Sequence, residues 1–219
     1  MNNASSTSSP GKSRPPHKLI YATGAIVDHE VMIRKRQELM EYACDLKLDP
    51  NTVNRVLSLS EGNRKVTQGG SQSYPDHPER FDDWHQVMCR ESLTGHCYWE
   101  TEWSGRGAGI SATYKGIRRK GGSDCEFGHN EKSWSLWCSD NSYTAVHNNQ
   151  TTHIPHHPSH THRVGVYLDW SSGTLSFYNI SSVTHTLTHL HTFHCTFTEP
   201  LYAGFYVYSG SSVSLCQIR

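Results

Sequence analysis

Two carboxylates, Glu100 and Glu102, stand two residues apart among large aromatic residues in the stretch HCYWETEW (96–103). Residues i and i+2 of a strand point to the same face, about 7 Å apart, so the pair has the residue types of a glycoside hydrolase acid and base. Such an enzyme places its carboxylates on opposite sides of a sugar, whereas Trp99 and Trp103 would share the other face, where aromatic residues belong in a core. We therefore predict a core strand with a polar back and no active centre.

Histidine is the second residue type with chemical potential, because the chain holds 16 of them. Five lie in HIPHHPSHTH (153–162), and imidazole nitrogens bind divalent metals. This stretch has no cysteine or carboxylate at ligand spacing, so we expect an exposed loop that gains charge on acidification, and no metal site. A metal-binding histidine-rich protein is the minor alternative. His189 and His191 are expected to share one face of an extended segment as surface residues.

The nucleophilic residue types form no recognisable catalytic set. Seven cysteines are scattered singly, without a C-x-x-C pair, which predicts reduced thiols rather than a zinc or redox centre. The chain has no G-x-S-x-G nucleophile elbow and no protease signature around a cysteine. We therefore expect a protein that is not an enzyme and that needs no cofactor.

Composition limits the possible partners. The 219 residues include 20 Lys and Arg and 20 Asp and Glu, so no basic field exists to hold a phosphate backbone, which argues against nucleic acid. No apolar run approaches the ~20 residues of a membrane span, and the N-terminus has no signal-peptide core. These features predict a cytoplasmic protein.

The elements that must position these residues are mostly short strands. Residues 1–27 are expected to form a disordered tail and linker, and 28–42 a helix with Asp28 as its N-cap. Beyond Cys44, short runs of β-branched and aromatic residues alternate with turn residues, and 164–170 and 174–180 read as a hairpin closed by Gly173. The pattern predicts an all-β fold, an antiparallel β-sandwich with a short N-terminal helix.

The order of these motifs resembles the B30.2 domain, a PRY segment followed by a SPRY domain. The similarity runs through CDLKLDPNTVNRVLSLSEGNRKVT, YPDHPERFDDWHQVMCRESLTGHCYWETEW, KSWSLWCSDNSYTAVHNN, VGVYLDWSSGTLSFYNI and FTEPLYAGFYVYSGSSVSLCQI. The sequence of these motifs most resembles fish versions of the domain. The resemblance implies a B30.2 domain over 43–219, with PRY at about 43–93 and SPRY at about 94–219, folded as a bent sandwich of two antiparallel sheets.

The resemblance also implies a function. The family is a non-catalytic recognition module of tripartite-motif ubiquitin ligases, butyrophilins, fish NLR-type immune receptors and stonefish toxins, which indicates innate immune or ubiquitin-ligase-related signalling. The helix at 28–42 lies where tripartite-motif relatives end their coiled coil, so an oligomer is expected only if this helix self-associates. A targeting fragment of a larger ligase, receptor or pore-forming toxin is the alternative.

Loops at one end of a sandwich can vary while the sheets hold them rigidly, and aromatic residues there make good anchors for a protein partner. By position in the family, the variable stretches are 104–109, 137–143, 149–162 and 205–210. Trp134 is assigned to the core. The predicted partner-binding residues are four aromatic anchors and two polar residues that add selectivity: Trp137, Tyr143, Tyr206, Tyr208, Arg106 and Asp140.

Overall fold

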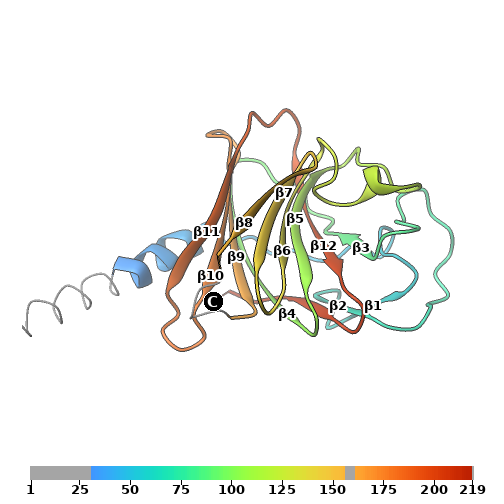
Figure 1. Cartoon of the computed structure of the whole chain (residues 1–219), viewed down its shortest axis with the longest axis horizontal. Coiled ribbons are helices and arrows are strands. Elements are labelled where there is room, and N and C mark those ends of the chain that lie inside the picture. The colour runs from blue at the N-terminus through green and yellow to red at the C-terminus, as the bar shows by residue number, and fades with distance from the viewer. Residues whose placement is uncertain (1–30, 156–160, 219) are drawn as a thin grey trace, which may run out of the picture.

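A computed structural model describes residues 31–155 and 161–218, which form two stacked antiparallel sheets (Figure 1). The seven-stranded sheet has the order β1 (Leu57–Ser60), β2 (Lys65–Gln68), β13 (Ser212–Leu215), β4 (His96–Ser104), β9 (Arg163–Asp169), β10 (Thr174–Ile180) and β11 (Leu187–His194). The six-stranded sheet has the order β3 (Gln86–Met88), β12 (Leu201–Val207), β5 (Ala108–Tyr114), β6 (Ser133–Cys138), β7 (Tyr143–His147) and β8 (Gln150–Ile154). The predicted β-sandwich is confirmed.

The core lies between the two sheets, and every second residue of a strand faces it. On β9 and β10, alternate apolar residues such as Val166, Leu168 and Phe177 are fully buried. Trp134, assigned to the core from the sequence, is also buried there. Gly173 closes the predicted hairpin with a φ of 69°, a conformation that glycine adopts without strain. Burial of these alternating apolar side chains supplies the main driving force for the sandwich.

Strand β4 separates its aromatic residues from its acids. Trp99 and Trp103 are buried in the core, and Glu102 is exposed on the other side. Glu100 shares that outer side but is 0% exposed, because the helix over residues 31–40 covers it. The predicted polar side of β4 is therefore exposed at Glu102 but covered at Glu100. One of its two acids is a buried charge that needs partners.

The buried Glu100 carboxylate has three partners. Arg36 of the helix donates from Nε to Oε1 (2.7 Å) and from Nη2 to Oε2 (3.0 Å). Arg163 of β9 donates from Nη2 to Oε2 (2.6 Å), and the Tyr98 hydroxyl donates to Oε1 (2.7 Å). These charge-assisted bonds hold the pKa of Glu100 below its usual value although burial alone would raise it. The network fixes the helix to the outer face of the seven-stranded sheet.

The helix also makes an apolar contact with the sheet. Leu39 packs against the cluster of Tyr178, Ile180 and Leu187, and Lys35 Nζ lies 5.2 Å from the centre of the Tyr178 ring. The predicted range 28–42 begins outside the described residues. Within them, residues 31–40 are helical and confirm the short N-terminal helix. The predicted tail at 1–27 also lies outside the described residues.

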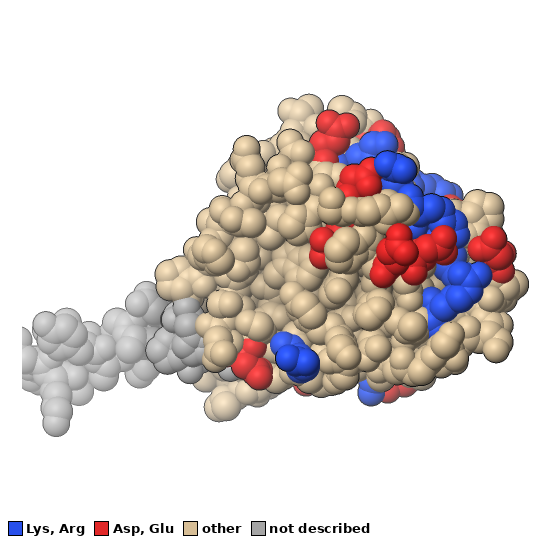
Figure 2. All heavy atoms as spheres, turned by 45° about the vertical axis from the view of Figure 1, so that its right-hand side comes forward, with Lys and Arg blue, Asp and Glu red and all other residues tan. Residues whose placement is uncertain are grey.

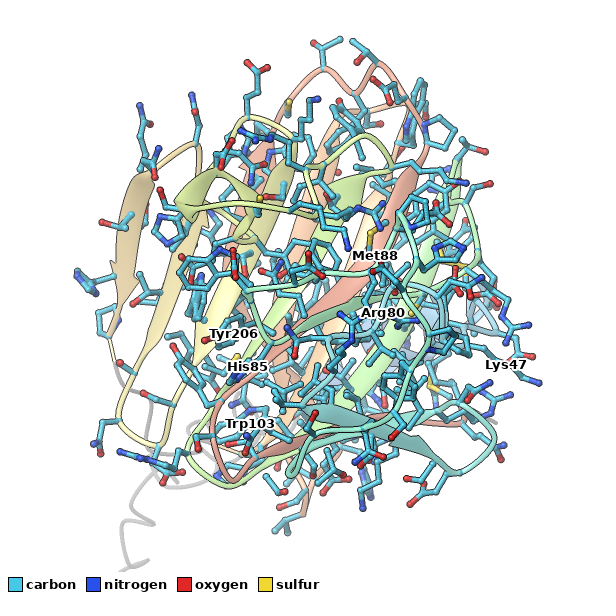
Figure 3. The ribbon with its side chains drawn as sticks, turned by 90° about the vertical axis from the view of Figure 1, so that its right-hand side faces the viewer. Lys47, Arg80, His85, Met88, Trp103 and Tyr206 are labelled. Carbon is cyan, nitrogen blue, oxygen red and sulfur yellow. A yellow bond between two sulfur atoms is a disulfide. The ribbon has the colours of Figure 1, made fainter. Side chains whose placement is uncertain are left out.

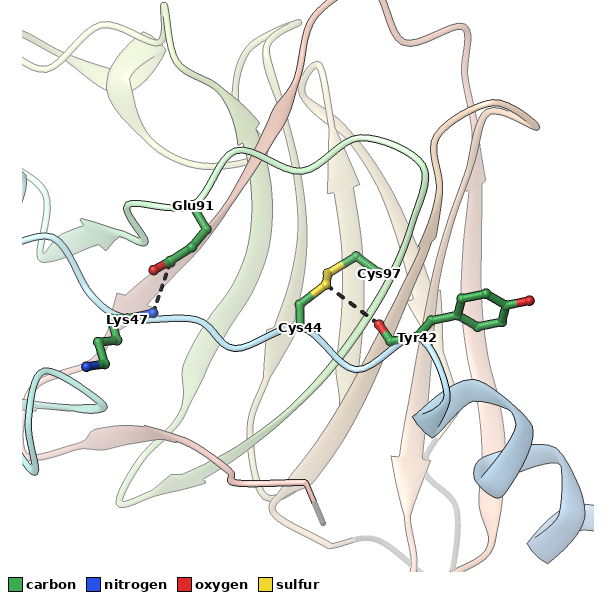
Figure 4. The surroundings of a disulfide bond; sticks show 5 residues. All are labelled: Tyr42, Cys44, Lys47, Glu91 and Cys97. Carbon is green, nitrogen blue, oxygen red and sulfur yellow. Dashed lines mark hydrogen bonds between the residues drawn. A yellow bond between two sulfur atoms is a disulfide. The ribbon is translucent and has the colours of Figure 1, made fainter.

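The expectation of reduced thiols is wrong for one pair of cysteines. Cys44 and Cys97 form a disulfide, with their Cα atoms 5.7 Å apart. Figure 4 shows that it joins the segment just after the helix to the start of β4. The fold brings together two cysteines that are separated by 53 positions, which no local spacing reveals. The other five cysteines, at 89, 125, 138, 195 and 216, are free.

Two expectations for the histidine-rich segments change. Part of the predicted loop 149–162 is the strand β8, and residues 156–160 lie outside the described residues. The register of β10 against β11 shifts between Phe177 and Tyr178, so that His191 pairs with Phe177 and His189 with Tyr178. This bulge places the two histidines on opposite faces of the sheet, and the prediction of a shared face is wrong.

Candidate partner-binding site

Three neighbouring strands bring two aromatic rings together on the outer face of the six-stranded sheet. Tyr206 of β12 pairs with Gly109 of β5, and Gly109 pairs with Trp137 of β6. Because Gly109 has no side chain, the two aromatic rings meet above it, with centroids 4.9 Å apart. A Cβ atom at position 109 would lie 3.1 Å from the Tyr206 Cβ. The glycine therefore sets the spacing of the rings.

Further rings extend this pair into an aromatic patch. Tyr208 lies 5.6 Å from Trp137 and 5.2 Å from Tyr206, measured between ring centroids. The patch consists of six half-buried aromatic side chains: Trp84, His85, His129, Trp137, Tyr206 and Tyr208. Figure 3 faces this side of the molecule and shows His85 beside Tyr206. Half-exposed Trp and Tyr side chains on a rigid sheet are typical anchors of a protein interface.

Hydrogen bonds hold the loops around the patch in place. Gln86, on edge strand β3, donates from Nε2 to the carbonyl of Cys125 (2.9 Å) and accepts from the backbone N–H of Phe127 (2.7 Å). Trp84 Nε1 donates to the carbonyl of Gly122 (2.9 Å). These bonds tie the segment before β3 to the loop that carries the short 3-10 helix η1 (Ser123–Cys125). The patch is therefore largely preorganised, which lowers the entropic cost of binding.

The electrostatics of the patch depend on one acid, Glu126. Its side chain is 14% exposed, and Nε2 of His129 lies 3.7 Å from its Oε2. Burial raises the pKa of Glu126. Burial, with the nearby Glu126 charge, also raises the pKa of Tyr206, and raises that of Tyr208 to about 12. Both phenols are therefore neutral at pH 7.

Three of the six predicted binding residues lie together in the patch. Trp137, Tyr206 and Tyr208 are half-buried on the same outer face. Arg106 is exposed in the neighbouring turn, where the N–H of Tyr208 donates to the carbonyl of Gly107. These four residues remain proposed contacts.

The other two predicted residues lie elsewhere. Asp140 is exposed at the β6–β7 turn and pairs with His162 (2.9 Å), which stacks on Trp103 at 3.9 Å. Tyr143 is 0% exposed, and its hydroxyl accepts a hydrogen bond from Asn179 Nδ2 (2.7 Å). Its assignment as a surface anchor is corrected, since a side chain that is completely buried cannot touch a partner.

Sequence reasoning missed Trp84, His85, Glu126 and His129. None lies in a stretch that the family pattern marks as variable, and the contact of Trp84 with Tyr206 joins segments that are far apart in sequence. The local signal was the pair Trp84 and His85 immediately before β3, because aromatic residues of this kind are enriched at interfaces.

Charges elsewhere on the surface are mixed in sign. Figure 2 shows acids and bases intermingled along one side of the molecule and a broad uncharged area beside them. Ion pairs of the described residues include Lys120 with Asp82 (2.9 Å) and Lys115 with Glu79 (3.6 Å). Within residues 31–155 and 161–218, no three His, Cys, Asp or Glu side chains are grouped as a metal site. No helix in this part of the chain is long and apolar enough to cross a membrane.

Comparison with known proteins identifies relatives of the whole sandwich. The family model of PRY, the SPRY-associated domain, matches residues 46–93, and that of the SPRY domain matches residues 96–218. Stonustoxin subunit beta of Synanceia horrida is 48% identical over 178 residues, which are 80% of this chain and 25% of the toxin subunit. Tripartite motif-containing protein 16 of Mus musculus is 42% identical over 179 residues, which are 80% of this chain and 31% of that protein.

Solved structures agree with these matches. The stonustoxin structure superposes with a TM-score of 0.75 at 44% identity, over 83% of this chain and 28% of the toxin chain. The crystal structure of the TRIM65 PRY-SPRY domain superposes with a TM-score of 0.75 at 29% identity, over 84% of this chain and 96% of that one. The chain thus spans about a quarter of the toxin subunits that it matches. By sequence and by fold, the chain belongs to the PRY-SPRY family, also called B30.2.

Proposed function

We propose that this chain is a non-catalytic recognition module that binds a protein or peptide through the aromatic patch, with Arg106 adding selectivity. The observation that carries the proposal is the group of half-buried rings at Trp137, Tyr206 and Tyr208, held on three paired strands of one sheet. Rigid aromatic side chains bury a large area at a small entropic cost, which is why they dominate binding energies at interfaces.

The family supports this proposal. SPRY domains are protein-interaction modules in tripartite-motif proteins and toxin subunits. A role in innate immune or ubiquitin-ligase-related signalling in the cytoplasm is the finer form of the proposal. Because the chain spans about a quarter of the stonustoxin subunit, a second candidate is a targeting unit for an activity encoded in a longer protein.

Affinity capture with patch variants tests the proposal. Trp137→Ala and Tyr206→Ala should each weaken binding of the captured partner at least about tenfold, since each removes an anchor worth about 2 kcal/mol. Tyr42→Ala is the matched control, because Tyr42 is an exposed tyrosine next to Tyr167 and His96 of the other sheet. The captured protein is identified by mass spectrometry, and its affinity is then measured with purified components.

Melting temperatures separate binding from folding. The two patch variants should melt within a few degrees of the wild-type protein, because half-exposed side chains contribute less to stability than core residues. Unchanged affinity in both patch variants, or an equal loss in Tyr42→Ala, would refute the proposed site. Failure to fold would show that the rings belong to the core.

A further inference from the structure

We propose that the aromatic patch recognises an arginine side chain of its protein partner, with the Glu126 carboxylate as the counter-charge and Trp137 and Tyr206 as the rings that the guanidinium contacts. This inference rests on the proposed function and names the chemistry of the ligand. Two acids on opposite faces of the sandwich differ in their partners: Glu100 is buried, and Glu126 is half-buried.

Glu100 and Glu126 differ in how well they are compensated. The Glu100 carboxylate receives hydrogen bonds from two arginines and a tyrosine. The Glu126 carboxylate, with a side chain only 14% exposed, accepts no hydrogen bond from the described residues, and Nε2 of His129 lies 3.7 Å from its Oε2. A desolvated carboxylate without donors is costly unless a ligand supplies them. The Glu126 carboxylate can therefore still accept hydrogen bonds from a cationic group of a ligand.

The rings around this acid suit a cation. His129 links Glu126 to the patch, because its ring also lies 6.3 Å from the Trp137 ring in an edge-on arrangement. Trp137 in turn contacts Tyr206 at 4.9 Å. The negative charge of Glu126 also raises the pKa values of Tyr206 and Tyr208, which places the acid within electrostatic reach of both rings. The faces of Trp and Tyr rings attract cations, most strongly where water is excluded.

Arginine fits this arrangement better than other side chains. An acidic group would be repelled by Glu126, and an apolar group would desolvate the carboxylate further without supplying a donor. A guanidinium is planar and weakly hydrated, so it can stack on an aromatic ring while its N–H groups reach a carboxylate in a forked geometry. A lysine ammonium is more strongly hydrated and cannot stack. The charge and the flat rings together select arginine.

The test uses the full chain labelled with ¹⁵N and simple probes in the millimolar range. Acetyl-arginine amide is titrated at pH 8, where imidazoles are mainly neutral, and the indole N–H signals of Trp137 and Trp84 are followed by NMR. The Trp137 ring is half-buried in the patch, so its indole N–H signal should respond to a guanidinium that stacks on the ring. Acetyl-citrulline amide has nearly the same shape as the arginine probe but no charge. Acetyl-lysine amide with a free side-chain amine has the charge but no planar guanidinium.

The expected result is a saturable shift of the Trp137 signal with the arginine probe, a weaker response to the lysine probe and none to citrulline. Glu126→Gln should weaken arginine binding about tenfold, as expected for a lost charge-assisted bond. Glu131→Gln, an exposed acid in the same loop, should leave the binding unchanged. Glutamine keeps the size of residue 126 and removes its desolvated charge, so the variant should fold.

Other outcomes would overturn the inference. An equal response to citrulline, or an unchanged affinity in Glu126→Gln, removes the carboxylate from recognition. An equal response to lysine leaves a general cation site and refutes the choice of arginine. If a captured partner depends on Trp137 and Tyr206 but not on Glu126, the proposed function stands and this inference fails. If the arginine probe binds but the partner ignores both rings, the proposed function fails, and recognition of a partner's arginine fails with it.

Discussion

Glu100 and Glu102 are separated by one residue, yet their surroundings differ completely. The period of a strand predicts that both lie on the back of β4, and it correctly places Trp99 in the core. It does not predict the burial of Glu100, because the covering residue, Arg36, is 64 positions away in sequence. Side-chain direction is a local property, whereas burial depends on what packs above the strand.

Removal of the Glu100 charge should be costly. We expect Glu100→Gln to lower the free energy of unfolding by about 3 kcal/mol, because it leaves Arg36 and Arg163 without their shared anion. The control is Glu102→Gln, which alters an exposed acid on the same strand and should change stability by less than about 0.5 kcal/mol. Urea denaturation measures both, and equal effects would contradict the assigned role of the network.

The same carboxylate gives a pH dependence. The pKa of Glu100 is lower in the folded protein than its usual value, so its contribution to stability is complete above the usual value and is lost as the pH falls through the lower one. The wild-type melting temperature should therefore fall below about pH 4.5 more steeply than that of Glu100→Gln. Parallel melting curves of the two proteins from pH 6 to pH 3 would count against this origin.

At the scale of elements, local chemistry was predictable and long-range contacts were not. The 164–180 hairpin follows from its alternation and its glycine. Strand β8 escaped prediction because its residues QTTHI are polar and almost wholly exposed, so they carry no apolar period. Tyr143 was misplaced because it pairs with the inward-facing Cys138, a register that the family pattern does not specify. Trp84 and Glu126 join the patch only through the folded sheet.

The helix over residues 31–40 should behave as part of the folded domain. Arg36→Ala removes its bonds to Glu100, so backbone amides of this helix should exchange with deuterium several-fold faster, as local unfolding becomes easier. Arg34→Ala is the matched control, since Arg34 is exposed on the same helix. Equal exchange in both variants would show that the ion pair does not hold the helix, and would favour a helix free to self-associate.

At the scale of the whole molecule, the disulfide closes a long loop. Cys44 and Cys97 are 53 positions apart, for which the chain-entropy model gives a stabilisation of about 4 kcal/mol. Thiol titration of the denatured, oxidised protein should find five reactive groups, and peptide mapping without reductant should recover the linked pair. Reduction should lower the melting temperature, whereas Cys195→Ser, which alters a free half-buried thiol, should keep this response to reductant. Seven reactive thiols would contradict the pairing.

The two attachments to β4, the Arg36–Glu100 ion pair and the Cys44–Cys97 disulfide, also have a mechanical consequence. The helix is held to this strand by the bond between Arg36 and Glu100, and the segment that follows is held to it by the disulfide at Cys97. The helix lies on the outer face of one sheet, and the aromatic patch lies on the outer face of the other. A pulling force applied to the helix would therefore be carried by the Cys44–Cys97 disulfide into β4. The rings around Gly109 would keep their spacing under tension.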